Sequence, residues 1–194
     1  HLMVTDQPLD LQAGDAELAV RAVQTLPDSG LIARKIVDYD FALYCSRDYA
    51  ERMGAPATIA DLINHDLIGG DAGLDTVPAM IWMFEQVDGK APVTRSNSMS
   101  NLVHAVRAGM GVAPLPCVVA DADSRLVRCS ECIESAVSTS YILLRRELKD
   151  TPRVRALIDF LVPYMQADMK TRLERGRQMR EQQAANDGEP QDLS

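Results

Sequence analysis

The stretch Ser96–Pro116, SNSMSNLVHAVRAGMGVAPLP, constrains the fold more than any other part of the chain. Apolar residues follow Ser100 at helical spacing, and serine and asparagine side chains satisfy the free N–H groups at a helix start. We therefore expect a helix that begins near Ser100 and ends at Gly109, because glycine readily takes the left-handed conformation found at helix ends. A short apolar strand, Val112–Leu115, should follow. A helix enclosed this tightly by strands is typical of an open α/β sheet.

The polar entry to this helix, Ser96-Asn97-Ser98-Met99-Ser100, is the leading candidate for a ligand-binding edge. Open α/β sheets bind ligands outside the carboxyl ends of their strands and beside helix N-termini. The hydroxyl groups of Ser98 and Ser100, the Asn101 amide and the helix N–H groups together suit a carboxylate. The alternative for the two serines is simple helix capping, which requires no ligand.

The rest of the chain predicts a series of short elements. The stretch Glu17–Val23 has a nearly continuous apolar face, which is typical of a parallel strand covered on both sides. Further extended segments are expected over Val4–Leu9, Leu31–Val37, Phe41–Cys45, Asp66–Gly70, Ala91–Arg95, Leu126–Cys129 and Ser138–Arg145, and helices over Pro56–His65 and Cys117–Ala120, with a helical turn at Asp10–Asp15.

The clearest helix is expected over Asp150–Met165, where Thr151 is the cap, Pro152 takes the first position and apolar residues form one stripe. This stripe is lost from Gln166 onward. Residues 166–194 are therefore expected to form a frayed helical extension and a disordered tail. At the other end, residues 1–3 (HLM) are expected to be a cloning remnant.

Net charge and the distribution of apolar residues exclude some classes of protein. The 194 residues carry a formal net charge of −8, which argues against a broad basic surface that would hold a nucleic-acid backbone. No apolar run approaches the length of a membrane span, and no secretory signal pattern opens the chain. We therefore expect a cytoplasmic protein with no membrane association.

Four motifs follow one another along the chain. They are Glu17, Ala19 and Arg21; Ser46, Tyr49 and Gly54 on a helix; Ala105-Val106-Arg107-Ala108-Gly109-Met110-Gly111 followed by Leu115-Pro116; and Thr151–Leu157. In this order they resemble the effector-binding domain of LysR-type transcriptional regulators, in which aspartate is more usual at the position of Glu17. No single motif is specific, but the ordered set, which covers residues 4–165, is.

The resemblance implies an α/β fold of two Rossmann-like lobes, similar to type 2 periplasmic binding proteins. Residues 4–37 and 139–165 would form lobe I and residues 38–138 lobe II, with crossover strands near Val37–Phe41 and Ser138–Ile142. In the family, a winged helix-turn-helix, a linker helix and a first strand-helix unit precede the point where this sequence begins. The resemblance thus implies an incomplete lobe I, a homo-oligomer, and DNA contact only through the N-terminal domain.

The implied function is the sensing of a small-molecule effector, expected to be a carboxylate, in a cleft between the lobes. Its binding residues would be Ser98, Met99, Ser100 and Asn101, with Val23, Gln24, Leu115 and Pro116 as walls. Arg34 and Arg95 could be charge partners, or simply solvated surface residues.

Other functions are less well supported. His104 lies one helical turn after Ser100, but no nucleophile elbow or partner carboxylate accompanies the pair, so no catalytic residue is expected. A solute-binding protein of a transporter is the alternative with the same fold, and the ordered motifs favour the regulator. The four cysteines are Cys45, Cys117, Cys129 and Cys132. They predict unpaired thiols, with redox sensing or metal binding as the alternative, and no metal or cofactor is expected.

Overall fold

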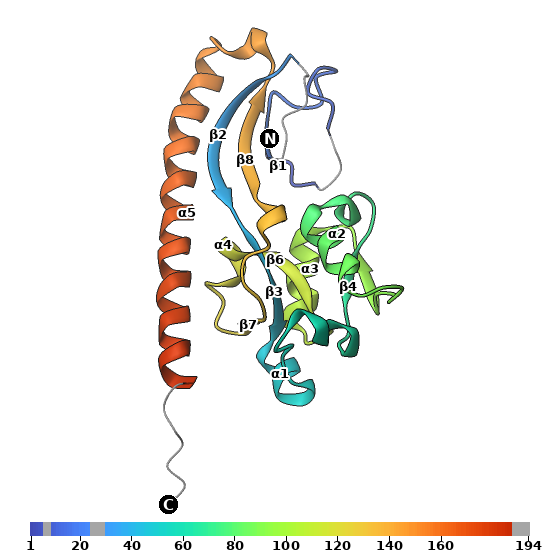
Figure 1. The fold of residues 1–194 in the computed structure, drawn as a ribbon. Coiled ribbons are helices and arrows are strands. Elements are labelled where there is room, and N and C mark those ends of the chain that lie inside the picture. Colours follow the sequence, from blue (N-terminus) through green and yellow to red (C-terminus); the bar gives the residue numbers. More distant parts are fainter. Residues whose placement is uncertain (6–8, 24–29, 188–194) are drawn as a thin grey trace, which may run out of the picture. The chain divides into compact units, whose positions relative to one another are not determined.

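The fold of the chain is shown in Figure 1, a computed structural model that describes residues 1–5, 9–23 and 30–187. The chain divides into two compact α/β units, which confirms the predicted fold class. Unit 1 consists of residues 1–39 and 137–169, and unit 2 of residues 40–136 and 170–194, as far as these are described. Each unit is considered by itself below.

Unit 1 contains a three-stranded antiparallel sheet with the order β1-β8-β2. Its strands are β1 (Leu18–Val23), β2 (Ile32–Tyr39) and β8 (Ser138–Leu144), with the 3₁₀ turn η4 (Arg146–Leu148) after β8. The central strand β8 places Ile142 opposite both Val20 and Arg34, and β2 has an irregular register between Lys35 and Val37.

Two strand predictions for unit 1 are wrong. The strand β1 is antiparallel to β8, and the Val20 side chain is 44% exposed, so β1 is not a parallel strand covered on both sides. A short apolar run cannot by itself specify the direction of its partner or how many faces are covered. The residues of Val4–Leu9 that the structure describes, Val4, Thr5 and Leu9, are not in a strand.

The first half of helix α5 (Pro152–Asp187) covers one face of this sheet. Its predicted apolar stripe supplies Val154, Ile158 and Val162, which pack against Ile36 and Ile142 from the strands. The helix begins as the sequence predicts, because the Thr151 carbonyl accepts hydrogen bonds from the N–H groups of Val154 and Arg155.

Unit 2 is built around β3 (Phe41–Ser46), a strand in which every residue is buried. It pairs antiparallel on one side with β6 (Ala113–Pro116) and on the other with β7 (Leu126–Arg128). Two further strands, β4 (Ile68–Gly70) and β5 (Thr94–Ser96), are parallel to each other, and Leu67, next to β4, bridges to Val112, next to β6.

Short helices surround these strands. The α-helices are α1 (Arg47–Met53), α2 (Pro78–Glu85), α3 (Met99–Arg107) and α4 (Cys117–Ala120), and the 3₁₀ helices are η1 (Ile59–Asn64), η2 (Leu74–Thr76) and η3 (Glu134–Ala136). The helix predicted over Pro56–His65 corresponds to η1, which Thr58 and Asp61 start with a capping box, and it is 3₁₀ rather than α. The predicted helix at the central stretch corresponds to α3 and starts one residue earlier than expected.

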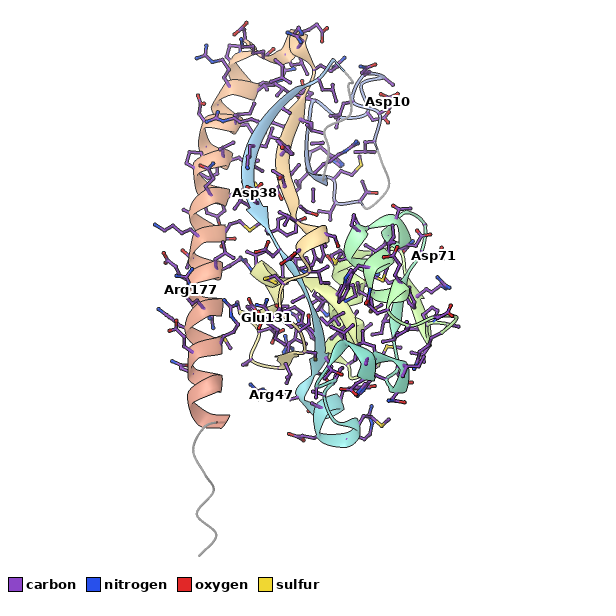
Figure 2. The ribbon with its side chains drawn as sticks, in the orientation of Figure 1. Asp10, Asp38, Arg47, Asp71, Glu131 and Arg177 are labelled. Atoms are coloured by element: carbon purple, nitrogen blue, oxygen red, sulfur yellow. The ribbon has the colours of Figure 1, made fainter. Side chains whose placement is uncertain are left out.

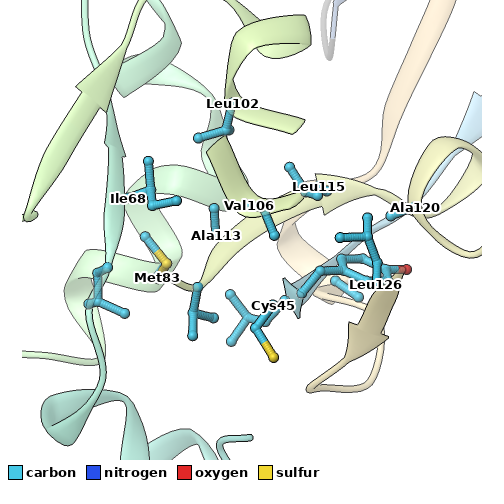
Figure 3. Packing of buried hydrophobic residues seen from close by; sticks show 14 of the residues in the cluster. Cys45, Ile68, Met83, Leu102, Val106, Ala113, Leu115, Ala120 and Leu126 are labelled. Carbon is cyan, nitrogen blue, oxygen red and sulfur yellow. The ribbon is translucent and has the colours of Figure 1, made fainter. Parts of the chain in front are cut away.

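One hydrophobic core holds unit 2 together, and Figure 3 shows part of it. Leu43 and Cys45 from β3 lie in the same cluster as Leu102 and Val106 from α3 and Met83 from α2. The apolar spacing seen in the central stretch therefore has a packing role: it directs one face of α3 into this core.

The second half of α5 lies in the stretch that was expected to form a helical extension, and the helix continues to Asp187. Two contacts explain why the polar stretch is ordered. Gly176 lies so close to Asp121 that a Cβ atom on it would come within 2.5 Å of the Asp121 side chain, and Arg180 forms an ion pair with the Asp121 carboxylate. The Asp121 carboxylate also accepts a hydrogen bond of 2.6 Å from the Tyr44 hydroxyl group. Long-range contacts of this kind leave no local sequence pattern.

The loop after α4 is held by Asp123, whose side chain is only 9% exposed. Its carboxylate accepts hydrogen bonds from the guanidinium groups of Arg107 and Arg125 and from the Arg125 backbone N–H. Burial alone would raise the pKa of Asp123, but these hydrogen bonds outweigh it and lower the pKa from its ordinary 3.8 to about 2.

We expect Gly111→Ala to lower the free energy of unfolding by about 2–3 kcal/mol. Gly111 has φ +154°, and a Cβ atom there would lie 2.4 Å from the Asp66 carbonyl oxygen. Gly89→Ala is the matched control, since its φ is +70° and nothing lies within 4 Å of the added carbon. The control should lose only about 1 kcal/mol in urea unfolding. Equal losses for the two variants would contradict the close approach at Gly111.

We expect Asp123→Asn to destabilise the protein by about 2 kcal/mol at neutral pH. Because the folded-state pKa is depressed, the carboxylate contributes stability above about pH 4 that is lost as the pH falls through about 2. The difference between wild type and variant, measured by urea unfolding, should therefore shrink between these two pH values. Asp88→Asn, at an exposed position, is the control and should show no such difference. A constant difference across this range would exclude the proposed ionic role.

Candidate functional site

A pocket of about 330 Å³ lies in unit 2, beside the ends of β4 and β5 and the first turns of α3. The residues that line it are Ile68, Asp71, Thr94, Arg95, Ser96, Asn97, Asn101, Ala105 and Met110. The carboxyl ends of two parallel strands and a helix start thus meet here, as expected for a binding edge of an α/β sheet.

The glycines at the end of β4 make this edge possible. A Cβ atom on Gly70 would lie 2.4 Å from the backbone nitrogen of Asp75, so only glycine lets the following loop fold back this closely. The loop is tied to β5 by a 2.8 Å hydrogen bond from the Asp71 N–H to the Ser96 carbonyl. Asp71, labelled in Figure 2, therefore lies directly beside the end of β5.

Arg95 provides the positive charge of the pocket. One of its guanidinium nitrogens donates a 3.2 Å hydrogen bond to the Gly70 carbonyl, which orients the side chain along the strand ends. Within the described residues, Arg95 takes part in no ion pair, although Asp71 lines the same pocket. The guanidinium group thus keeps donors for an external carboxylate.

Arg95 also borders a second hollow, of about 380 Å³, with a different character. Its walls are mainly apolar and come from α2. Besides Arg95, the lining residues are Gly70, Asp75, Met80, Ile81, Phe84 and Glu85. A single cation therefore lies next to both a polar pocket and an apolar surface, an arrangement that suits a molecule with a carboxylate and an apolar body.

The start of α3 is held by Ser96 and not by the serines predicted as caps. The Ser96 hydroxyl group accepts a hydrogen bond from the Ser98 N–H at 3.1 Å and donates one to the Ser98 carbonyl at 2.9 Å. Ser98 takes the N-cap position, but its side chain makes no capping hydrogen bond, and Ser100 is exposed. The structure therefore does not support the capping alternative for Ser98.

The predicted site residues have different locations. Asn101 lines the polar pocket, whereas Ser98 and Ser100 do not. Met99 packs against the core of unit 2.

Leu115 was expected as a wall of the site, but it is fully buried in the core, and Pro116 is also buried. Both belong to β6, which pairs with the central strand β3, so their side chains serve packing. Val23 ends β1 in unit 1, and Gln24 lies outside the described residues, so the contribution predicted for these two residues stays a prediction.

Asp71 and Thr94 were missed by the sequence reasoning. A signal for Asp71 was available, because it follows the apolar run and paired glycines of DLIGG directly, where the carboxyl end of a strand was expected. Thr94 and Ile68 give no such signal, since each is an ordinary strand residue in the sequence.

His104 and Ser100 do not form a catalytic pair in the structure. His104 and Ser100 are both exposed, and no hydrogen bond joins their side chains in the described part of the chain. His65 is buried, and its Nδ1 lies 3.3 Å from the Tyr49 hydroxyl group, which accepts a hydrogen bond from the Asp66 N–H. His65 is therefore a core residue with a polar partner.

Arg34 and metal binding were the remaining candidates from the sequence. Arg34 lies 3.7 Å from Asp159 in an exposed ion pair of unit 1. No cluster of three or more His, Cys, Asp or Glu residues that could hold a metal ion occurs among the described residues.

Comparison with known proteins decides the family. A family model described as the LysR substrate binding domain matches residues 1–166. The chain belongs to this LysR family. The assignment favours a regulatory domain over a transporter's solute-binding protein, as the ordered sequence motifs predict.

A relative found by sequence comparison agrees with this assignment. An HTH-type transcriptional regulator of Xanthomonas campestris pv. campestris (strain 8004) is 45% identical over 51 residues, which is 26% of this chain and 14% of that protein. The match therefore spans only a small part of the relative's length.

Solved structures support the fold of this LysR family member. The CrgA regulatory domain of Neisseria meningitidis, a LysR-type transcriptional regulator, is 23% identical with a TM-score of 0.67, over 80% of this chain and 78% of that one. The AmpR effector domain of Pseudomonas aeruginosa is 18% identical with a TM-score of 0.65, over 87% and 82%. Full-length AphB of Vibrio cholerae is 23% identical with a TM-score of 0.64, over 85% of this chain and 57% of that one.

Among the described residues, no helix has the length and apolarity needed to span a membrane.

We expect the double change Ser98→Ala and Ser100→Ala to alter the free energy of unfolding by less than about 0.5 kcal/mol. The reason is that neither hydroxyl group makes a hydrogen bond within the described structure. Ser46→Ala is the control, because the Ser46 hydroxyl caps α1 by accepting from the Tyr49 N–H at 3.0 Å. Urea unfolding should show a loss of about 1–2 kcal/mol for this control. A similar loss for the double variant would return Ser98 and Ser100 to the capping role.

Proposed function

We propose that this chain is the effector-sensing domain of a LysR-type transcriptional regulator, and that its effector is a small carboxylate with an apolar body. The observation that carries the proposal is the position of Arg95, which has no ion-pair partner among the described residues and borders both the polar pocket and the apolar hollow of unit 2. The family assignment supports a sensing role, and the pocket supports the chemistry of the ligand.

The carboxylate would be held by charge-assisted hydrogen bonds. Arg95 offers a planar fork of N–H donors, and the side chains of Ser96, Asn97 and Asn101 line the same pocket and add neutral hydrogen-bonding groups. The first N–H groups of α3 have no partner within the helix and bring the positive end of the helix dipole to this region.

The apolar part of the effector would contact the surface of α2. Ile81 and Phe84 expose this surface, and binding would gain about 25 cal/mol for each Å² of apolar area that the ligand removes from water. An aromatic or short aliphatic carboxylate satisfies both requirements. A purely ionic ligand would leave the apolar hollow unused.

Sensing would act through a shift in population. An effector that binds one arrangement of the domain better than another increases the population of that arrangement by its difference in affinity. The mechanism involves no catalysis. We propose that the domain works in the cytoplasm as part of a homo-oligomer, and that DNA is contacted by a separate N-terminal domain of the whole protein.

The first test is a thermal-shift screen against aromatic and short aliphatic carboxylates, because a ligand of the folded state raises the melting temperature by mass action. For a carboxylate that binds, Arg95→Gln should weaken affinity about 10- to 100-fold, the usual effect of losing a hydrogen bond to a charged group. Titration calorimetry would measure this change.

Arg155→Gln is the matched control for that test. Arg155 is an exposed residue of α5, in unit 1, and takes no part in the pocket. This variant should bind the carboxylate as the wild type does. If Arg95→Gln binds the same carboxylate with unchanged affinity, the pocket beside Arg95 is not the effector site.

A further inference from the structure

Two thiols that lie far apart in the sequence meet inside unit 2. The Sγ atoms of Cys45 and Cys129 are 3.5 Å apart, although 84 positions separate the two residues. Cys45, one of the core residues labelled in Figure 3, is fully buried, whereas Cys129 is partly exposed. The pair therefore joins a fully buried cysteine to one that packs at the edge of the core and is partly exposed.

Strand pairing sets this distance. Cys45 on β3 pairs with Val127 on β7, and the Cys129 N–H donates a 2.8 Å hydrogen bond to the Leu43 carbonyl. Side chains two residues apart on a strand share a face, so Cys45 and Cys129 are diagonal neighbours on one face of the sheet. A disulfide needs an S–S distance of about 2.05 Å, so the two sulfur atoms, now 3.5 Å apart, must move closer together when the bond forms.

The other two cysteines are placed differently. Cys132 lies near Cys129 in the sequence, with C-x-x-C spacing, but its Sγ atom accepts a 2.9 Å hydrogen bond from the Arg128 guanidinium group. Cys117 is buried beside Tyr44, and burial raises the pKa of its thiol to about 12. The hydrogen bond to Cys45, together with burial, raises the pKa of the Cys129 thiol as well, so the choice of pair rests on the distance between the two sulfur atoms. The structure thus favours a pair that the C-x-x-C spacing does not suggest.

We infer that Cys45 and Cys129 form a dithiol that hydrogen peroxide or an organic hydroperoxide oxidises to a disulfide. The Cys129 sulfur attacks the peroxide, its S–O bond forms as the O–O bond breaks, and water or an alcohol leaves. The Cys45 sulfur then attacks the sulfenic acid, an S–S bond forms, and the oxygen departs as water with the two remaining protons. One peroxide is reduced by two electrons for each disulfide formed.

The disulfide would link β3 to β7 and close a long loop of unit 2. Cross-linking residues this far apart in the sequence restricts the unfolded chain, so the oxidised protein should resist unfolding more than the reduced one. This inference does not depend on the identity of the effector. It adds a second chemical input to the unit that carries the Arg95 pocket.

For the test, the whole chain is first reduced and the reductant is removed. The protein is then treated with hydrogen peroxide or tert-butyl hydroperoxide. Intact mass spectrometry should show the loss of two hydrogens, and peptide mapping without reduction should join the peptides that contain Cys45 and Cys129. The melting temperature should rise by at least about 5 °C and return to its starting value after reduction.

Variants make the assignment specific. Cys129→Ser, at a partly exposed position, should abolish the disulfide, and Cys132→Ser should leave it intact. In Cys45→Ser, dimedone should label Cys129 after peroxide treatment, because the sulfenic acid lacks its partner. Four free thiols after peroxide treatment, or a disulfide that includes Cys117 or Cys132, would overturn the inference.

Discussion

The pairing of β3 with β6 and β7 is the interaction on which the rest of unit 2 depends. All six residues of β3 are buried, so its backbone groups cannot be satisfied by water and must be paired within the sheet. The same strand ends at Ser46, whose hydroxyl group caps α1, and begins beside Asp40, whose carbonyl accepts the Cys117 N–H at the start of α4. One strand thus fixes the starting points of two helices.

The binding edge depends on a second constraint, the close approach of backbone at glycines. The loop after β4 folds back over Gly70, and the chain between α3 and β6 passes against the Asp66 carbonyl at Gly111. These contacts place the ends of β4 and β5 and the first turns of α3 next to one another. Arg95 then lies beside both a polar and an apolar surface and forms no ion pair among the described residues, although Asp71, Asp75 and Glu85 line the same two hollows.

Helix α5 shows how one element can be specified by two different kinds of interaction. Its first half packs Val154, Ile158 and Val162 against the sheet of unit 1, and this apolar stripe is visible in the sequence. Its second half has no such stripe and is held on unit 2 by the fit of Gly176 against Asp121 and by the Arg180 ion pair. The helix was therefore predictable to Met165 and was underestimated beyond it.

The sequence by itself determined the α/β class, the family and most short elements, because these depend on local spacing, capping residues and glycines. Tertiary structure alone decided which polar groups meet. Ser98 and Ser100 were expected to act as caps or ligands, but Ser96 holds the turn and Asn101 lines the pocket. It also decided that β1 is antiparallel and that Leu115 belongs to the core. Strand direction, pocket composition and the meeting of Cys45 with Cys129 arise from pairing between distant segments, which leaves no periodic signal in the sequence.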